Sequence, residues 1–144
     1  MNLGATLYVK DSNGAVELYK KAFGLTLGYN LSYEDTEGMK AYGLDVADDY
    51  VPYKGYFHAD MVKNDKVVFS ISGEMDANVD GSALGFYQKE IQLSIGLDSM
   101  EAVQHAFDVL SEEGRVECEP APAADIHYGS VIDKYNIWWY LDIG

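Results

Sequence analysis

The stretch DSNGAV at residues 11–16 decides the fold, because it returns as DSMEAV at residues 98–103. After each copy, apolar residues recur at three- and four-residue steps, as on one face of an amphipathic helix. We expect Ser12 to cap the first helix and Gly24 to end it, while Gly114 follows the second. The two copies therefore predict two equivalent helices.

The surroundings of the two copies also repeat. The expected helices cover 15–23 and 102–110, and each has one strand pattern before it and three after it. Tight turns are expected at Asn64-Asp65 and at Tyr135-Asn136. The expected strands are 5–9, 26–33, 56–62 and 66–72 in the first half, and 90–97, 115–119, 126–133 and 138–143 in the second.

This order, βαβββ twice, predicts an α+β fold. We expect paired βαβββ modules forming a cupped mixed β-sheet, with the helices on its convex face. The chain is interpreted as a single domain, with module one at 1–75, a linker at 76–87 and module two at 88–144.

Composition excludes several classes of function. The 144 residues are 48% hydrophobic, enough for a core, and carry a net charge of −14. Such a charge disfavours binding to nucleic acid or to anionic membranes, and no apolar run approaches the ~20 residues of a membrane span. The first residues resemble no signal peptide, and Cys118 is the single cysteine. We expect a cytoplasmic protein, because one cysteine cannot form an internal disulfide.

Alternation along the strands predicts one polar and aromatic sheet face opposite the helices. That face is either the wall of a binding cup or a solvated surface, and the large aromatic side chains favour the cup. The expected ligand-binding residues are Tyr8, His58, Ser70, Glu90, Gln92, Trp138 and Tyr140.

Several segments resemble the vicinal oxygen chelate superfamily, which includes glyoxalase I, extradiol dioxygenases, and bleomycin- and fosfomycin-resistance proteins. The similarity is greatest to the PhnB-like branch and spans nearly the whole chain. It is carried by YVKD at 8–11, LYKKAFG at 18–24, HADM at 58–61, YGSVID at 128–133 and Ile137-Trp138. The resemblance implies the paired-module fold and a homodimer.

Metal-dependent members of that superfamily place one ligand on each of four strands. The resemblance maps those positions onto Gly4 or Thr6, Phe69 or Ser70, Ile91 or Gln92, and Tyr140. None is a histidine or a carboxylate, whereas a transition-metal site needs three or four strong donors. We therefore expect no metal, no other cofactor and no catalytic residue of that chemistry. The chain also departs from the PhnB-like pattern at 125–127, where that branch often has a Trp-Gly pair.

The remaining reactive side chains give weaker signals. His58 and Asp60 share one strand face, where they could act as a general base, as a single pair of metal ligands or as a structural hydrogen bond. The structural hydrogen bond is the favoured interpretation. His105 is expected to face solvent, and Cys118 lies between two glutamates that disfavour its thiolate. Neither a phosphate-binding loop nor a nucleophile elbow is present.

The long segment at 34–55 is unusual because six of the twelve tyrosines lie within or beside it, together with many acidic residues. It is interpreted either as a lid or partner surface or as a solvated loop.

These observations predict an uncharacterised glyoxalase/bleomycin-resistance-like protein that binds an unknown small molecule without metal. The alternatives are a metal-dependent lyase or dioxygenase of the same superfamily, and a protein-interaction module acting through the Tyr-rich segment at 34–55.

Overall fold

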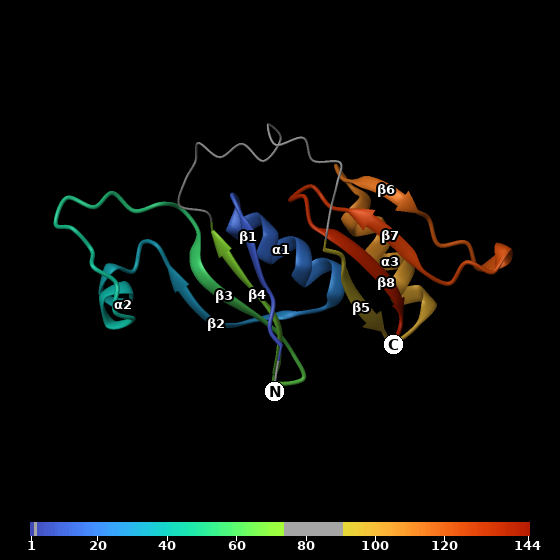
Figure 1. The fold of residues 1–144 in the computed structure, drawn as a ribbon, viewed down its shortest axis with the longest axis horizontal. Helices are drawn as coiled ribbons and strands as arrows, with labels where there is room; N and C mark the ends of the chain where they lie inside the picture. The colour runs from blue at the N-terminus through green and yellow to red at the C-terminus, as the bar shows by residue number, and fades with distance from the viewer. Residues whose placement is uncertain (2, 74–90) are drawn as a thin grey trace. The chain divides into compact units, whose positions relative to one another are not determined.

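The computed structural model describes residues 1, 3–73 and 91–144. They contain two four-stranded mixed sheets and three α-helices, the α+β class that the sequence predicts (Figure 1). Glu90 and the expected linker at 76–87 lie outside the described residues.

The chain divides into two compact units. The first comprises Met1–Lys20 and Leu25–Ala77, and the second comprises Lys21–Gly24 and Asn78–Gly144. The boundary therefore passes through one helix, whose last residues pack with the second unit.

The first sheet has the order β1-β4-β3-β2, in which β1 runs parallel to β4 and the other pairs are antiparallel. Its elements along the chain are β1 (Thr6–Val9), α1 (Ser12–Phe23), β2 (Thr26–Ser32), α2 (Thr36–Ala41), β3 (Tyr56–Lys63) and β4 (Lys66–Gly73).

The second sheet has the order β5-β8-β7-β6, and its parallel pair is β5 with β8. Its elements are β5 (Leu93–Leu97), α3 (Met100–Ser111), β6 (Arg115–Cys118), the 3₁₀ turn Pro122–Ala124, β7 (Gly129–Ile132) and β8 (Trp138–Ile143). The two strand orders are equivalent, which confirms the predicted repeat of βαβββ.

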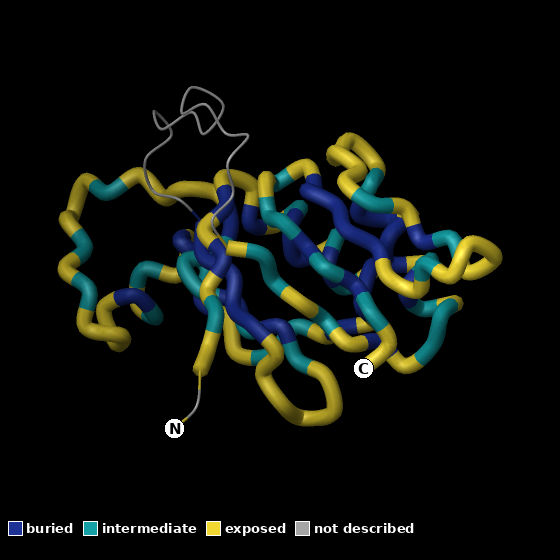
Figure 2. Tube along the Cα trace, turned by 45° about the vertical axis from the view of Figure 1, so that its right-hand side comes forward, coloured by how far each residue is buried: buried dark blue, intermediate teal, exposed yellow. Residues whose placement is uncertain are grey.

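Each unit buries its own apolar face (Figure 2). In the first, the Tyr19 ring of α1 meets the Phe69 ring of β4 edge to face, with 5.5 Å between centroids. In the second, the apolar side of α3 and the buried Trp139 and Leu141 of β8 form the core, and Phe23 packs on Trp139 at 5.1 Å. Burial of these apolar side chains is the main driving force for each unit.

The predicted cap of α1 is wrong. Asp11 performs that role, since its Oδ1 accepts from the Gly14 N–H at 3.0 Å. Ser12 is buried instead, and its Oγ accepts from the Tyr56 N–H at 2.8 Å, joining the helix start to β3. In the second copy, Ser99 is the N-cap of α3, with its Oγ accepting from the Ala102 N–H at 3.2 Å.

Residues with a left-handed backbone conformation lie at the helix ends and in the hairpin turns. Gly24 ends α1 at φ +64°, as predicted. After α3, however, Glu113 adopts φ 58°, and Gly114 is needed for space because a Cβ there would meet the carbonyl oxygens of Ile132 and Leu110. Asn64 and Asp65 both have positive φ, which confirms the first predicted turn.

Two strands begin three residues later than predicted. β5 begins at Leu93 within the described residues, and β7 begins at Gly129. Before β7, Ile126 forms an isolated bridge with Ala121, because the intervening 3₁₀ turn folds the chain back on itself.

The segment at 34–55 is not a plain solvated loop. It contains α2, which is capped by Asp35 through a 2.9 Å hydrogen bond from the Gly38 N–H. Met39 of α2 is buried with Leu31 and Tyr33 in a small core, against which Leu44, Val46, Tyr50 and Phe57 pack. Tyr33 anchors this core, since its hydroxyl donates to the Gly73 carbonyl at 2.6 Å.

Candidate functional site

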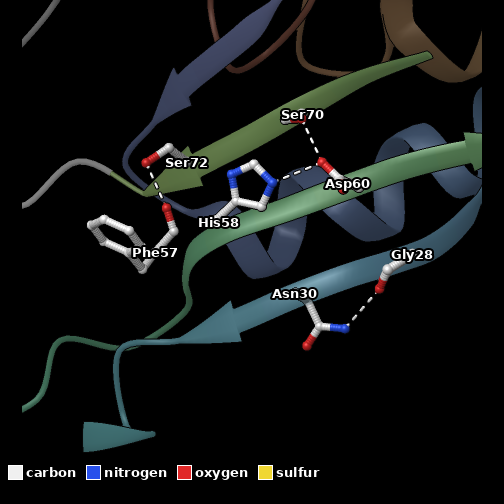
Figure 3. A network of polar contacts seen from close by, with 7 residues as sticks. All are labelled: Gly28, Asn30, Phe57, His58, Asp60, Ser70 and Ser72. Atoms are coloured by element: carbon white, nitrogen blue, oxygen red, sulfur yellow. Dashed lines mark hydrogen bonds and ion pairs between the residues drawn. The ribbon is translucent and has the colours of Figure 1, made fainter. Parts of the chain in front are cut away.

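The polar face of the first sheet is organised around Asp60 of β3. Thr6, Ser70 and Asp60 lie side by side across β1, β4 and β3. Ser70 Oγ donates to Asp60 Oδ1 at 2.7 Å, and His58 Nε2 lies 2.7 Å from the same oxygen (Figure 3). A carboxylate can only accept, so Nε2 donates to Asp60, and in the neutral imidazole the lone pair is on Nδ1.

The His58 imidazole is accessible but sheltered. The His58 side chain is 26% exposed and that of Asp60 18%. The Tyr29 ring of β2 lies beside the imidazole, with 5.9 Å between centroids, and is itself exposed. Figure 3 shows the imidazole on the side of the sheet away from α1. His58, Asp60 and Ser70 thus form one hydrogen-bonded group on the polar face of the first sheet.

The polar face of the second sheet is organised around Ser130 of β7. Ser94, Tyr140 and Ser130 lie side by side across β5, β8 and β7. Ser130 Oγ accepts from Gln92 Nε2 at 3.1 Å and from Trp138 Nε1 at 3.0 Å. Amide and indole donors therefore converge on one buried hydroxyl.

Aromatic side chains flank Ser130. Tyr128 and Tyr140 stack with 5.2 Å between centroids and 23° between planes. A hydrogen bond with the Cys118 side chain raises the pKa of the Tyr128 hydroxyl, and charge on that sulfur adds to the effect. Tyr128 is exposed and Tyr140 half-buried, so part of the stacked pair is open to a ligand.

Six of the seven expected ligand-binding residues fall on these two faces, and the seventh, Glu90, lies outside the described residues. His58 and Ser70 meet through Asp60, while Gln92 and Trp138 meet through Ser130, beside Tyr140. Tyr8 is exposed on β1, opposite Ser72 of β4, so it shares the first face.

Asp60, Ser130 and Tyr128 were not among the expected ligand-binding residues. The alternation of β3 and of the segment leading into β7 could have found them, because Asp60 is two residues from His58 and Ser130 is two residues from Tyr128.

The donors do not fit a transition metal. The mapped ligand positions that reach the polar faces carry Thr6, Ser70, Gln92 and Tyr140, which are neutral oxygen or amide groups. In the part of the chain that is described, no three His, Cys, Asp or Glu side chains gather in one place. The other histidines are exposed: His127 pairs with Asp125, and His105 contacts the Lys21 carbonyl.

Sequence comparison identifies no relative, since no protein-family model and no curated protein matches the chain. Helices long and apolar enough to cross a membrane are absent from residues 1, 3–73 and 91–144.

Solved structures do match. The PhnB protein of Bacillus cereus superposes with a TM-score of 0.70 over 100% of both chains, at 15% identity. A Bacillus cereus protein described as a possible glyoxalase gives 0.55 at 20% identity, over 98% of this chain and 99% of that one. The fosfomycin-resistance protein FosX of Listeria monocytogenes gives 0.60 at 12% identity, over 100% of this chain and 91% of its own.

These similarities define the class as an α+β protein of the glyoxalase-like type. More particularly, the chain shares the fold of these PhnB and FosX proteins, which is the fold expected from its resemblance to the vicinal oxygen chelate superfamily. At such identities the similarity is one of fold.

Proposed function

We propose that this glyoxalase/bleomycin-resistance-like chain binds a small molecule without a transition metal, and that the Ser130 face is a main contact surface. The observation that carries the proposal is the double hydrogen bond to Ser130 Oγ. Because Gln92 and Trp138 occupy both lone pairs of this buried oxygen, its own O–H is directed to another acceptor. The described residues provide no acceptor for it.

The side chains around Ser130 support a flat ligand that carries an acceptor. Tyr140 and Trp138 offer ring surface, and the Gln92 amide keeps its oxygen for a ligand donor while its nitrogen is engaged. A net charge of −14 favours a neutral or cationic ligand over an anion.

Metal independence rests on donor chemistry. FosX of Listeria monocytogenes has also been solved with Mn(II) and sulfate. The side chains of Thr6, Ser70, Gln92 and Tyr140 offer no histidine and no carboxylate to such an ion.

A thermal-shift screen of neutral and cationic aromatic compounds and of divalent metals tests the proposal. At one hundred times its Kd, a ligand stabilises the folded state by about 2.7 kcal/mol, or roughly 8 °C for a domain of this size. We expect such a compound to exist, and its shift to fall sharply in Gln92→Ala and Tyr140→Ala. Tyr42→Ala is the matched control, because Tyr42 is an exposed tyrosine of the segment at 34–55.

Equal shifts in the wild type and in both face variants would place binding elsewhere. A shift produced by a transition metal alone would contradict metal independence, and loss of binding only in Tyr42→Ala would favour the Tyr-rich segment as the interaction surface.

We also propose a cytoplasmic homodimer, supported by the single free cysteine and by the resemblance to a superfamily that commonly dimerises. Sedimentation should then give twice the 16.0 kDa mass of the chain, and a monomer at high micromolar concentration would refute the dimer.

A further inference from the structure

The hydrogen-bonded group of His58, Asp60 and Ser70 belongs to the first sheet and is distinct from the Ser130 face of the second sheet. Two donors, the Ser70 hydroxyl and the His58 Nε2–H, converge on one Asp60 oxygen at 2.7 Å each. This arrangement holds the imidazole in a single tautomer and leaves Nδ1 as the basic atom. No described residue donates to Nδ1.

A comparison within the chain shows that the pairing is more than the ordinary contact of a histidine with a nearby aspartate. His127 and Asp125 are also two residues apart, but their separation is 3.0 Å and their side chains are 51% and 97% exposed. His58 and Asp60 are at 2.7 Å and 26% and 18% exposed. The His58–Asp60 pair is therefore closer and less exposed to water than the His127–Asp125 pair.

The groups around His58 indicate which kind of ligand could give a proton to its Nδ1 atom. The groups facing His58 are Asp60 on its own strand, Tyr29 on β2, and Ser70 on β4, which does not titrate. The Tyr29 ring offers aromatic contact beside the imidazole. No described cation joins this group, and the net charge of −14 repels preformed anions. A neutral ligand with an acidic O–H therefore fits the group, because it can give a proton to Nδ1 without arriving as an anion.

We propose that His58, oriented by Asp60, is a proton-accepting site for a neutral phenol that lies against Tyr29. The phenol O–H bond breaks, its proton moves to Nδ1 of His58, and the electron pair stays on the phenol oxygen. The product is a phenolate paired with an imidazolium that Asp60 stabilises. The Ser130 site is not needed for this step, so either proposal can fail without the other.

The test uses 4-nitrophenol and the full chain, at a pH near the pKa of the free phenol, where neutral imidazole is still present to accept a proton. The phenolate has a separate visible absorption band, so the spectrum reports proton transfer directly. The phenolate band of the same phenol in buffer alone is subtracted. We expect wild-type protein to produce the band, His58→Gln to reduce it at least about tenfold, and Asp60→Asn to weaken it by a similar factor. Glutamine can still donate to Asp60, so the first variant should keep its fold.

His127→Gln is the matched control and should leave the band unchanged, because that pair is exposed. A bound phenol that stays neutral, a band unaffected by His58→Gln, or no binding of 4-nitrophenol would each overturn the proposal. Nitrogen-15 NMR of the imidazoles provides a second measurement without ligand. In the neutral imidazole of His58, it should find the proton on Nε2 and none on Nδ1. The opposite tautomer would also overturn the proposal.

Discussion

The two sheets place a hydrogen-bond acceptor at the same topological position but use different chemistry there. Asp60 lies on β3 opposite Ser70, and Ser130 lies on β7 opposite Tyr140. Each accepts two side-chain hydrogen bonds, from a hydroxyl and an imidazole in the first case and from an amide and an indole in the second. The repeat preserves where polar side chains meet, while the residue types differ between the two sheets. The first sheet brings together a carboxylate, an imidazole and a hydroxyl, and the second an amide, an indole and a hydroxyl.

The largest expected effect is a difference in stability between the same substitution made in the two copies of the repeated motif. Ser12→Asp should destabilise the fold by about 4 kcal/mol, because it buries a carboxylate where the serine now accepts from Tyr56. Ser99→Asp should change stability by less than about 0.5 kcal/mol, since aspartate is an equally good N-cap. Urea unfolding of both variants measures the difference, and equal losses would mean that the two serines are equivalent after all.

Asp133 distinguishes the two hairpins. The first turn has positive φ at Asn64 and Asp65. The second has positive φ at Asn136 and is also held by the buried Asp133 carboxylate. That carboxylate accepts from the N–H groups of Tyr135 and Ile137 and from Trp139 Nε1 at 2.8 Å. Asp133→Ala should therefore cost about 3 kcal/mol in chemical denaturation. Asn64→Gly, which suits positive φ, is the control and should cost almost nothing.

Tyr33 tests the segment that only the first unit contains. Tyr33→Phe should cost about 2 kcal/mol, because it leaves the Gly73 carbonyl without its buried donor. Burial raises the pKa of Tyr33 above its ordinary value of 10.0, with the neighbouring Tyr50 adding to the effect.

The sign of the pH dependence follows from that direction. The folded state holds the phenol proton more tightly than the unfolded state, so the stabilisation is complete below pH 10.0 and is lost as pH rises through the higher folded pKa. The wild type should lose stability above pH 10.0 more steeply than Tyr33→Phe. Parallel curves from thermal melts at alkaline pH would contradict this account.

The smallest effects compare the two acceptors directly. Asp60→Ala should cost about 1.5 kcal/mol, since it removes a charge-assisted acceptor from two donors, and Ser130→Ala about 1 kcal/mol. The expected losses of stability are modest because the Asp60 side chain is partly exposed and the Ser130 side chain is neutral. The urea midpoints of the two variants, measured in one buffer, compare their losses of stability. A larger loss for Ser130→Ala would contradict the expectation that the charged acceptor contributes more.

The repeat made the topology predictable, because the periodicity of both helices and the order of the strands are local properties of the chain. The cap of α1 was not predictable from the letters alone. Ser12 and Ser99 occupy the same place in the motif, and only the tertiary approach of Tyr56 decides that Ser12 is buried. The helix α2 was missed because six residues are too few to show a period.

The site was predictable as a face but not as a set of contacts. Alternation put Ser70 and Tyr140 on the polar sides of their strands. The hairpin register, which the sequence analysis did not predict, places Ser70 opposite Asp60 and Tyr140 opposite Ser130. The central roles of Asp60 and Ser130 depend on which side chain reaches which oxygen across strands, and that information is not local. A shared cup formed by the two modules remains a prediction.

The parallel pairs β1 with β4 and β5 with β8 constrain the order in which the protein can fold as it is synthesised. The hairpins β3–β4 and β7–β8 join near neighbours in sequence and can form early, because closing a short loop costs little entropy. An edge strand of each unit, β1 or β5, must wait until the last strand of that unit leaves the ribosome. During that interval a nascent chain exposes an unpaired strand and the apolar side of a helix, which is when a chaperone has most to protect.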